Sequence, residues 1–391
     1  MKWLHVLPSV DPRRGGPIEG VRNLGVHLRR LGHSVEVVTL DDPSEPFIKE
    51  FPLHLYPLGP SVGSYRYCKR LVPWLKIHAH EFGAVIINGI WQFSSLGTAH
   101  VLRGTDIPYF VFTHGMLDPW FKRTYPLKHL KKWLYWPWGE YRVLRDTRAV
   151  LFTCEEERRL ARQSFWLYQA NEKVVGYGIR SPPQEKAFLR ERFLSTHPEL
   201  HGRRILLFLG RLQPKKGCDI LINAFARVAN IDQSVSLVMA GPDEMGSLSK
   251  LESLARKLGV WDRITWPGML GGEMKWGAFY SSEAFILPSH QENFGIAVAE
   301  AMACELPVLI SDKINIWREI EKDQAGLVDA DTIDGTERTL RRWLSMLPDA
   351  RKAMGFQASQ SFLRRFTIES MANSLLELMS EPEESKVADI S

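Results

Sequence analysis

The chain has 391 residues, of which 45% are hydrophobic and 24% charged, and its formal net charge is +5. This composition excludes a disordered chain, which lacks the apolar residues that offset chain entropy, and it also excludes collagen-like and coiled-coil proteins. The length suffices for two or three domains.

The first half of the sequence alternates short apolar runs with segments of helical period. A run at 3–7 is followed by a helix in which Val21, Leu24, Leu28 and Leu31 share one face and Gly32 supplies the stop. Further apolar runs lie at 35–40, 85–87, 109–113 and 149–153. Thr153 with Glu156 three residues later resembles a capping box that opens another helix. This alternation predicts a doubly wound α/β fold.

A second series of apolar runs begins after the proline-bearing stretch at 178–183, and its members lie at 205–209, 235–240, 264–266, 284–287 and 307–310. These runs are apolar nearly throughout, as in parallel strands that are covered on both faces. We therefore expect two Rossmann-like domains, 1–180 and 181–365, that face each other across a cleft. The amphipathic stretch at 366–380 closes the second domain or, as we favour, crosses back to complete the first. The polar tail at 381–391 is expected to be mobile.

The segment AFILPSHQENFGIAVAEAMA at 284–303 is the most informative part of the chain. A buried strand ends at Pro288 and a helix begins near Gly295, so the free amides at 293–296 face the carboxyl edge of the sheet and favour an anion such as phosphate. Glu292 and Glu300 flank this site. Carboxylates beside an anion site serve the hydroxyl-bearing part of a ligand, which indicates a ligand that is part phosphate and part sugar. The alternative is that Glu292 caps the helix and Glu300 lies on a solvated face.

Three other segments end predicted strands. The loop GRLQPKKG at 210–217 sets Arg211 and Lys216 where they could clamp a diphosphate, although exposed lysines are often merely solvated, and it lacks the ending of a Walker A loop. The glycine turn at 15–17 allows close approach of backbone to a ligand, or is an ordinary tight turn. His114 ends a strand and would face the cleft, or is structural.

Taken together, the GRLxPxKG run at 210–217 and the Glu292/Glu300 pair within ENFGIAVAEAMACELPVL resemble family 4 of the retaining glycosyltransferases, which have the GT-B fold. The likeness extends to GGP at 15–17, NGIW at 88–91, THGMLDPW at 113–120, AGPDE at 240–244 and WPGML at 266–270. The resemblance implies a hexosyltransferase of EC class 2.4 that moves a sugar from a nucleoside-diphosphate sugar to a saccharide or lipid-linked acceptor. Such an enzyme acts in polysaccharide or glycolipid biosynthesis, with residues 1–180 on the acceptor side and 181–365 on the donor side.

The resemblance also implies roles for matched residues. Arg211 and Lys216 would hold the diphosphate, helped by the backbone of Gly16 and by the helix start, which comprises Asn293, Phe294 and Gly295. Glu292 would grip the hydroxyls of the donor sugar, and His114 would touch that sugar from the opposite domain. Glu292, His114, Arg211 and Lys216 are the catalytic candidates.

The nucleoside part of the donor would lie on the second domain. The resemblance implies that Glu300 accepts hydrogen bonds from the ribose hydroxyls, and that the base lies against backbone near Gly241 and in the turn that holds Met269 and Leu270. Two positions depart from the family pattern, because Glu305 stands where glycine is common and Tyr177 stands where asparagine is common.

No metal and no other cofactor is expected. Arg211, Lys216 and the helix N-terminus can stabilise the charge that develops on the leaving phosphate. Asp329 and Asp331 match the metal-binding Asp-x-Asp of a different glycosyltransferase fold, but they follow a short strand at 326–328 in a stretch that resembles a surface loop.

Residues 119–148 have the most unusual composition of the chain, with tryptophan and tyrosine interleaved with lysine and arginine. This mixture suits the interface of an anionic membrane, and it also suits stacking on polysaccharide or single-stranded nucleic acid. The alternative is a helical insertion whose tryptophans pack inward. Prolines at 119, 126 and 137 exclude one unbroken helix. We favour a membrane surface as the possible partner and expect no nucleic acid.

Four cysteines lie more than 60 residues apart, which gives neither zinc-ligand pairs nor a dense disulfide framework. We expect no signal peptide and no membrane-spanning helix, and hence a cytoplasmic protein that could lie on the inner face of the plasma membrane. The competing hypotheses are a nucleotide-sugar epimerase of the same fold and a non-catalytic sugar-binding protein that docks on membranes. A phosphorylase would need a lysine-bound cofactor site, and the sequence shows no such site.

Overall fold

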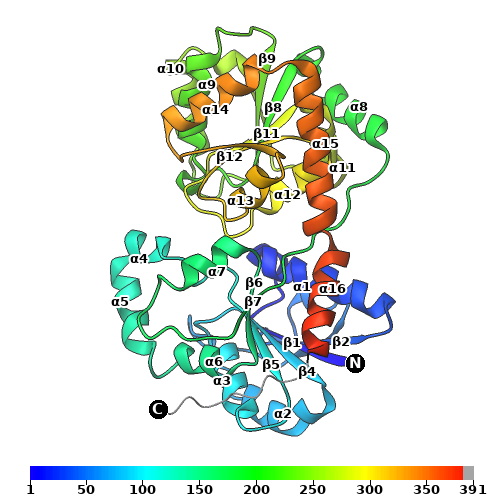
Figure 1. Cartoon of the computed structure of the whole chain (residues 1–391), viewed down its shortest axis with the longest axis vertical. Helices are drawn as coiled ribbons and strands as arrows, with labels where there is room; N and C mark the ends of the chain where they lie inside the picture. The colour runs from blue at the N-terminus through cyan, green and yellow to red at the C-terminus, as the bar shows by residue number, and fades with distance from the viewer. Residues whose placement is uncertain (382–391) are drawn as a thin grey trace.

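The computed structural model describes residues 1–381 and contains two sheets of parallel strands, one in each half of an elongated molecule (Figure 1). The first sheet has seven strands in the order β3-β2-β1-β4-β5-β6-β7. Their bounds are β1 (Lys2–Leu7), β2 (Ser34–Thr39), β3 (His54–Pro57), β4 (Ala84–Asn88), β5 (Tyr109–Phe112), β6 (Ala149–Phe152) and β7 (Glu172–Val174). The second sheet has six strands in the order β10-β9-β8-β11-β12-β13. Their bounds are β8 (Arg204–Leu209), β9 (Val235–Ala240), β10 (Ile264–Gly268), β11 (Ala284–Leu287), β12 (Val308–Ser311) and β13 (Gly326–Asp329).

Helices cover both faces of each sheet, and the two Rossmann-like sheets predicted from the sequence are confirmed. The helices of the first half are α1 (Gly16–Arg30), α2 (Leu71–His78), α3 (Phe93–Leu102), α4 (Trp120–Thr124), α5 (Pro126–Tyr135), α6 (Glu140–Asp146) and α7 (Glu155–Ala161). Those of the second half are α8 (Lys186–Thr196), α9 (Cys218–Val228), α10 (Leu248–Lys257), α11 (Gly272–Ser281), α12 (Ile296–Ala303), α13 (Trp317–Lys322), α14 (Ile333–Ser345) and α15 (Pro348–Arg365). The central strands are fully buried, which is why they read as continuous apolar runs.

Two local predictions were wrong. Leu31 does not share the buried face of α1; it follows the last helical residue and is 50% exposed. The capping carboxylate of α7 is Glu157 rather than Glu156. The helix starts one residue later than predicted, so Glu157 accepts hydrogen bonds from the backbone N–H and the hydroxyl of Thr153 at 2.8 and 2.6 Å.

The last described helix, α16 (Ile368–Ser380), returns to the first half of the chain and packs against α1 (Figure 1). Its buried face (Met371, Ala372, Leu375 and Leu378) belongs to the same apolar cluster as Trp3 and Leu24. The chain passes between the two halves twice, near Ile179 and near Phe366. The N–H of Ile179 donates to the carbonyl of Phe366 at 2.9 Å, so these two connecting segments lie side by side. The tail predicted to be mobile falls on residues 382–391, outside the described residues, apart from Glu381.

The aromatic and basic stretch at 119–148 forms α4, α5 and α6, and the prolines separate these helices as predicted. Trp136 packs inward and is fully buried, whereas Trp133, Trp138 and the leucines of α5 are exposed. The packed-insertion interpretation therefore holds for Trp136 alone. Across residues 1–381, no helix is both long and apolar enough to cross a membrane.

Candidate functional site

The carboxyl ends of the two sheets face each other. At the carboxyl ends of β8, β9 and β10, backbone hydrogen bonds that involve glycines join neighbouring strands. The N–H of Gly210 donates to the carbonyl of Ala240 at 2.9 Å, and the N–H of Gly241 donates to the carbonyl of Gly268 at 2.8 Å. A Cβ on Gly241 would lie 1.8 Å from the carbonyl oxygen of Gly210, so only glycine fits there. Met269 in the following turn, which was predicted to hold the base, is 76% exposed.

The loop between β11 and α12 carries the predicted anion site. Gly295 precedes α12 with a φ of +79°, and no side chain caps the helix, so its first amides remain available to a ligand. Gly217 ties this loop to the loop after β8, because a Cβ there would lie 2.2 Å from the carbonyl oxygen of Pro288. The N–H of His290 also donates to the carbonyl of Lys215 at 2.8 Å.

Lys216 and Glu292 form an ion pair of 2.5 Å in which both side chains are largely buried. Each charge thus has a partner in the absence of a donor, which offsets part of the cost of burial. Arg211 is different, because its side chain is half-exposed and lies 3.5 Å from the similarly exposed Glu244.

Glu300 accepts a hydrogen bond from Lys275 of α11 at 2.7 Å. Burial raises the pKa of Glu300, and Lys275 opposes that shift. Sequence reasoning missed Lys275, because nothing in the pattern of α11 marks one lysine as the partner of a carboxylate 25 residues away.

His114 lies at the end of β5 and faces the cleft with its backbone in the left-handed region, at a φ of +48°. Its ring stacks on Phe112, and its Nε2 lies 3.3 Å from Oδ1 of Asn88, whose amide lies 3.2 Å from Nδ1 of His5. Burial lowers the pKa of His114 to about 4, so the ring is neutral near pH 7. His114 can therefore exchange hydrogen bonds with a sugar but adds no charge.

Glu157 holds the turn that follows His114. It accepts hydrogen bonds from the hydroxyl of Thr113 at 2.9 Å and from the N–H of Gly115 at 2.6 Å, in addition to those from Thr153. This buried carboxylate fixes the ends of β5 and β6 together. Sequence reasoning missed it because the predicted cap was placed one residue earlier.

Direct contacts cross the cleft. Asn293 donates to the hydroxyl of Thr153 at 3.3 Å, Gln291 donates to Asp118 at 2.8 Å, and Arg318 of α13 pairs with Glu156 of α7 at 2.7 Å. The two halves therefore stand in a closed arrangement.

The N-terminus of α1 meets the N-terminus of α12. A Cβ on Gly16 would lie 2.9 Å from Cδ1 of Ile296. The hydroxyl of Tyr177 donates to the carbonyl of Gly16 at 2.6 Å, and its ring packs 5.0 Å from the ring of Phe294. Tyr177, which departs from the family pattern, thus contacts the starts of both helices where the two halves meet.

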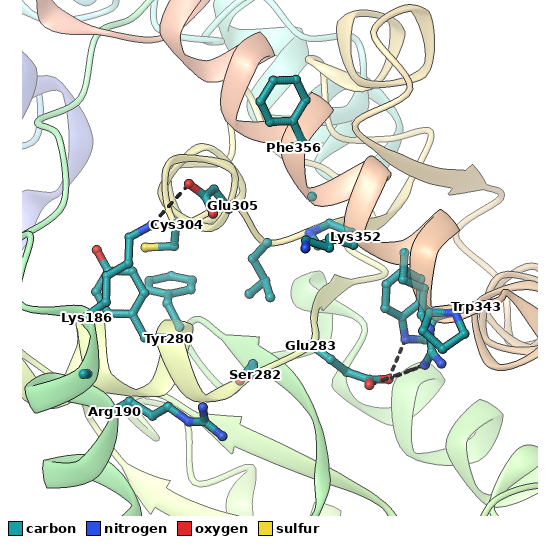
Figure 2. Close-up of a pocket in the computed structure, with 17 residues that line it drawn as sticks. Lys186, Arg190, Tyr280, Ser282, Glu283, Cys304, Glu305, Trp343, Lys352 and Phe356 are labelled. Atoms are coloured by element: carbon teal, nitrogen blue, oxygen red, sulfur yellow. Dashed lines mark hydrogen bonds and ion pairs between the residues drawn. The ribbon is translucent and has the colours of Figure 1, made fainter.

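A cavity of about 740 Å³ lies at the opposite, amino edge of the second sheet (Figure 2). Glu283, just before β11, accepts hydrogen bonds from Trp343 at 2.9 Å and from Arg204 at 2.7 Å in its wall. None of the predicted site residues lines this cavity, so the functional site is assigned to the cleft.

The two aspartates of the Asp-x-Asp match face different partners. Asp329 pairs with Arg338, and Asp331 lies 2.7 Å from His290. Within residues 1–381, no three His, Cys, Asp or Glu side chains gather in a way that could hold a metal ion.

Comparison with known proteins identifies relatives of both halves. Residues 190–361 match the model of the glycosyl transferases group 1, and residues 15–178 match that of the glycosyl transferase 4-like domain. A D-inositol 3-phosphate glycosyltransferase from Segniliparus rotundus is 33% identical over 95% of this chain and 86% of its own length.

Among solved structures, sucrose-phosphate synthase from Thermosynechococcus elongatus aligns with a TM-score of 0.76 at 19% identity, over 97% of this chain and 98% of its own. The Anabaena protein HepE, solved with UDP and glucose, aligns with a TM-score of 0.74 at 18% identity, over 98% of this chain and 100% of its own. These likenesses show the two-domain fold that the sequence predicts.

Proposed function

Since the chain belongs to the group 1 glycosyltransferase family, we propose that it transfers a hexosyl unit, with retention, from a nucleoside-diphosphate sugar to a saccharide or lipid-linked acceptor. The observation that carries this proposal is the convergence of charge and hydroxyl-binding groups in one cleft. Lys216, Glu292 and the start of α12 lie on the second half, and a Cβ on Gly115, the residue after His114, would lie 2.6 Å from the side chain of Asn293, just before α12.

In this proposal the nucleotide lies on the second half of the molecule. The glycine-built strand ends at Gly241 and Gly268 leave a flat surface for the base, and Glu300 accepts from the ribose. HepE, which shares the fold, was solved with UDP, and this likeness supports a nucleoside diphosphate as part of the donor.

The leaving diphosphate would develop negative charge as the sugar departs. Arg211, Lys216 and the amides at the start of α12 stabilise that charge, which is the step where such groups act most strongly. The acceptor hydroxyl attacks the anomeric carbon from the face that the diphosphate leaves, and its proton passes to the leaving phosphate oxygen. Because these cationic groups and amides would supply the positive charge that the leaving diphosphate needs, we propose that transfer requires neither a metal nor another cofactor.

We further propose that residues 1–180, completed by 366–380, form the acceptor side, and residues 181–365 the donor side. The surface of α5 supports an acceptor at a membrane, because it exposes apolar side chains beside basic ones. These exposed apolar residues are Tyr125, Leu127, Leu130, Trp133, Leu134 and Trp138. We accordingly propose a cytoplasmic enzyme that docks on an anionic membrane and serves polysaccharide or glycolipid synthesis.

The test is to incubate the purified protein, without added metal, with uridine, guanosine and adenosine diphosphate sugars and to measure released nucleoside diphosphate. We expect release from one donor, and loss of that release in Glu292→Ala. An epimerase would convert the sugar without free nucleoside diphosphate, and that result would overturn the proposal. If every donor stays intact, titration with UDP, GDP and ADP separates strict dependence on an acceptor from a protein that binds no nucleotide, and the absence of any binding would overturn the proposal.

A further inference from the structure

A cavity of about 820 Å³ opens between the two halves, beside the donor cleft. The first half contributes α4 and α7 to its walls, and the second half contributes the loops that carry Lys215 and His290 and the start of α13. Gln291 and Asp118, which are hydrogen-bonded to each other, also line it. The cavity therefore adjoins Lys216 and Glu292 along the chain.

The carboxylates of this cavity already have partners. Asp118 accepts from Gln291 and from the N–H of Trp120 at 2.8 Å each. Glu156 pairs with Arg318 at 2.7 Å, Asp312 with Lys313 at 2.9 Å and Asp331 with His290 at 2.7 Å. Each of these carboxylates thus has at least one partner, although Oδ1 of Asp312 is buried without a hydrogen bond among the described residues.

Several hydrogen-bond donors of the lining have no partner among the described residues, and two of them, on Lys215 and Asn315, lie on the loops of the second half. The side chain of Lys215 is half-buried, its ammonium lies 5.5 Å from the ring centre of Trp120, and no carboxylate of residues 1–381 forms an ion pair with it. Asn315 is only 3% exposed, and its amide Nδ2 has no hydrogen-bond partner among the described residues. Its backbone N–H donates to the carbonyl of Glu292 at 3.1 Å, which fixes it against the donor loop. A buried donor without an acceptor is costly, so Asn315 favours a ligand that carries acceptors, and Lys215 adds a positive charge to the same lining.

His290 supplies the complementary group. When its Nδ1 donates to Asp331, its Nε2 is left as an acceptor for a hydroxyl. Trp120 offers an aromatic face of the kind on which a sugar ring packs. The walls thus combine a cation, an amide donor, a hydroxyl acceptor and an aromatic face.

We propose that this cavity is the acceptor subsite and that the acceptor is a saccharide carrying a phosphate or a carboxylate. Lys215 and Asn315 bind the anionic group, Trp120 packs on the ring, and His290, oriented by Asp331, accepts from a hydroxyl. This assignment rests on the proposed function, because it takes the neighbouring cleft as the donor site.

The test compares glucose, glucose 6-phosphate and glucuronate as probes, by isothermal titration with the protein saturated in the nucleoside diphosphate that it binds among UDP, GDP and ADP. We expect at least tenfold tighter binding of one or both charged sugars than of glucose. Preference for glucose 6-phosphate alone identifies a phosphate, and preference for glucuronate alone identifies a carboxylate.

The variant Lys215→Gln is expected to abolish this preference while nucleotide affinity stays within about threefold. The matched control is Lys250→Gln, an exposed lysine of α10 far along the chain, which is expected to change neither affinity. Equal or undetectable binding of all three probes, or an unchanged preference in Lys215→Gln, would overturn the assignment. If the proposed function itself is wrong, no nucleoside diphosphate binds in the same titrations. This result differs from failure of the acceptor assignment, in which a nucleoside diphosphate still binds.

Discussion

Lys216 and Glu292 neutralise one another before any donor arrives, at an N···O distance of 2.5 Å. In the proposed function, a diphosphate that binds Lys216 would compete with Glu292 for the ammonium and would release the carboxylate toward the hydroxyls of the donor sugar. The pair would then link diphosphate binding to sugar binding through one exchange of partners.

Lys216→Ala is expected to weaken binding of the nucleoside diphosphate by about 2 kcal/mol or more, because a charged hydrogen bond is lost and the largely buried Glu292 is left facing the anion. Isothermal titration measures this change. Unchanged affinity would remove Lys216 from the diphosphate site.

Glu292→Ala is expected to act in the opposite way on binding. Nucleoside diphosphate affinity should hold or rise, because Lys216 no longer has an internal competitor. Turnover should fall by on the order of 100-fold, since the sugar loses a charged acceptor worth about 2–3 kcal/mol. Equal losses of turnover and affinity would refute the sugar-binding role of Glu292.

Glu305 explains why glycine is common at its position in the family. Its φ is +62°, in the left-handed region that side chains disfavour. Glu305→Gly is expected to raise the free energy of unfolding by about 0.5–1 kcal/mol, because relief of that strain exceeds the entropy that glycine adds to the unfolded chain. Urea unfolding measures the change. The control Glu305→Gln removes the same exposed pair with Lys186 without relieving the backbone, and a gain there would contradict the explanation.

The lysines of α5 lie in two different environments. Lys132 lies 4.5 Å from the ring centre of Trp91, and burial lowers its pKa to about 8, whereas Lys128 and Lys131 are exposed beside the apolar residues. Lys128→Ser with Lys131→Ser is therefore expected to weaken binding to anionic vesicles about tenfold or more, at roughly 1 kcal/mol for each lysine near a charged surface. Vesicle sedimentation measures this, with Lys250→Ser and Lys257→Ser of α10 as the control. Equal binding of both double variants would favour a helix that is merely solvated.

Glu140 at the start of α6 is fully buried beneath the same surface. It accepts from the N–H of Trp91 and the hydroxyl of Ser95, yet burial raises its pKa to about 7. Because the folded pKa exceeds the unfolded one, the stability that Glu140 contributes is full below about pH 4.5 and is lost as the pH rises through about 7. Melting temperatures between pH 5 and 8 should decline more steeply for the natural chain than for Glu140→Gln. Parallel profiles would contradict this role.

Strands that are buried on both faces could be predicted from the sequence. Short edge strands, and contacts that depend on residues far apart in the sequence, could not. Strands β9 and β11 were predicted to the residue, because every side chain in them is buried and all but Ser236 are apolar. The edge strands β3 and β7 were missed, since they are short and half-exposed. In the site, glycine turns and carboxylates appear as spaced motifs, but the partnerships of Lys275 with Glu300 and of His290 with Asp331 arise only when distant loops meet.

The two halves are joined by paired chain crossings near Ile179 and Phe366 and by the contacts across the cleft. The ion pair between Arg318 and Glu156 lies at the edge of the interface, so a charge change there acts on the arrangement of the halves. Such an arrangement permits hinge motion of the two halves about the paired connecting segments, which limit how far the halves can slide past each other.

Arg318→Glu is expected to open the molecule by placing two carboxylates against each other, and to lower the rate of donor cleavage several-fold. Small-angle scattering should show a larger radius of gyration. The double variant Arg318→Glu with Glu156→Arg restores opposite charges and should return both quantities toward those of the natural chain. An unchanged radius in the single variant would show that the ion pair does not hold the halves together.

The start of α1 abuts the start of α12 at Gly16 and Ile296, and each helix N-terminus carries a partial charge of about +0.5. These like charges repel each other across the contact between the halves, so in the proposed function a diphosphate bound between them would act as their counterion and stabilise the closed arrangement. An acceptor cavity made from both halves is complete only after that step. For the proposed reaction we therefore expect an ordered mechanism, in which the donor binds first, the acceptor second, and the freed nucleoside diphosphate leaves last and inhibits competitively with the donor.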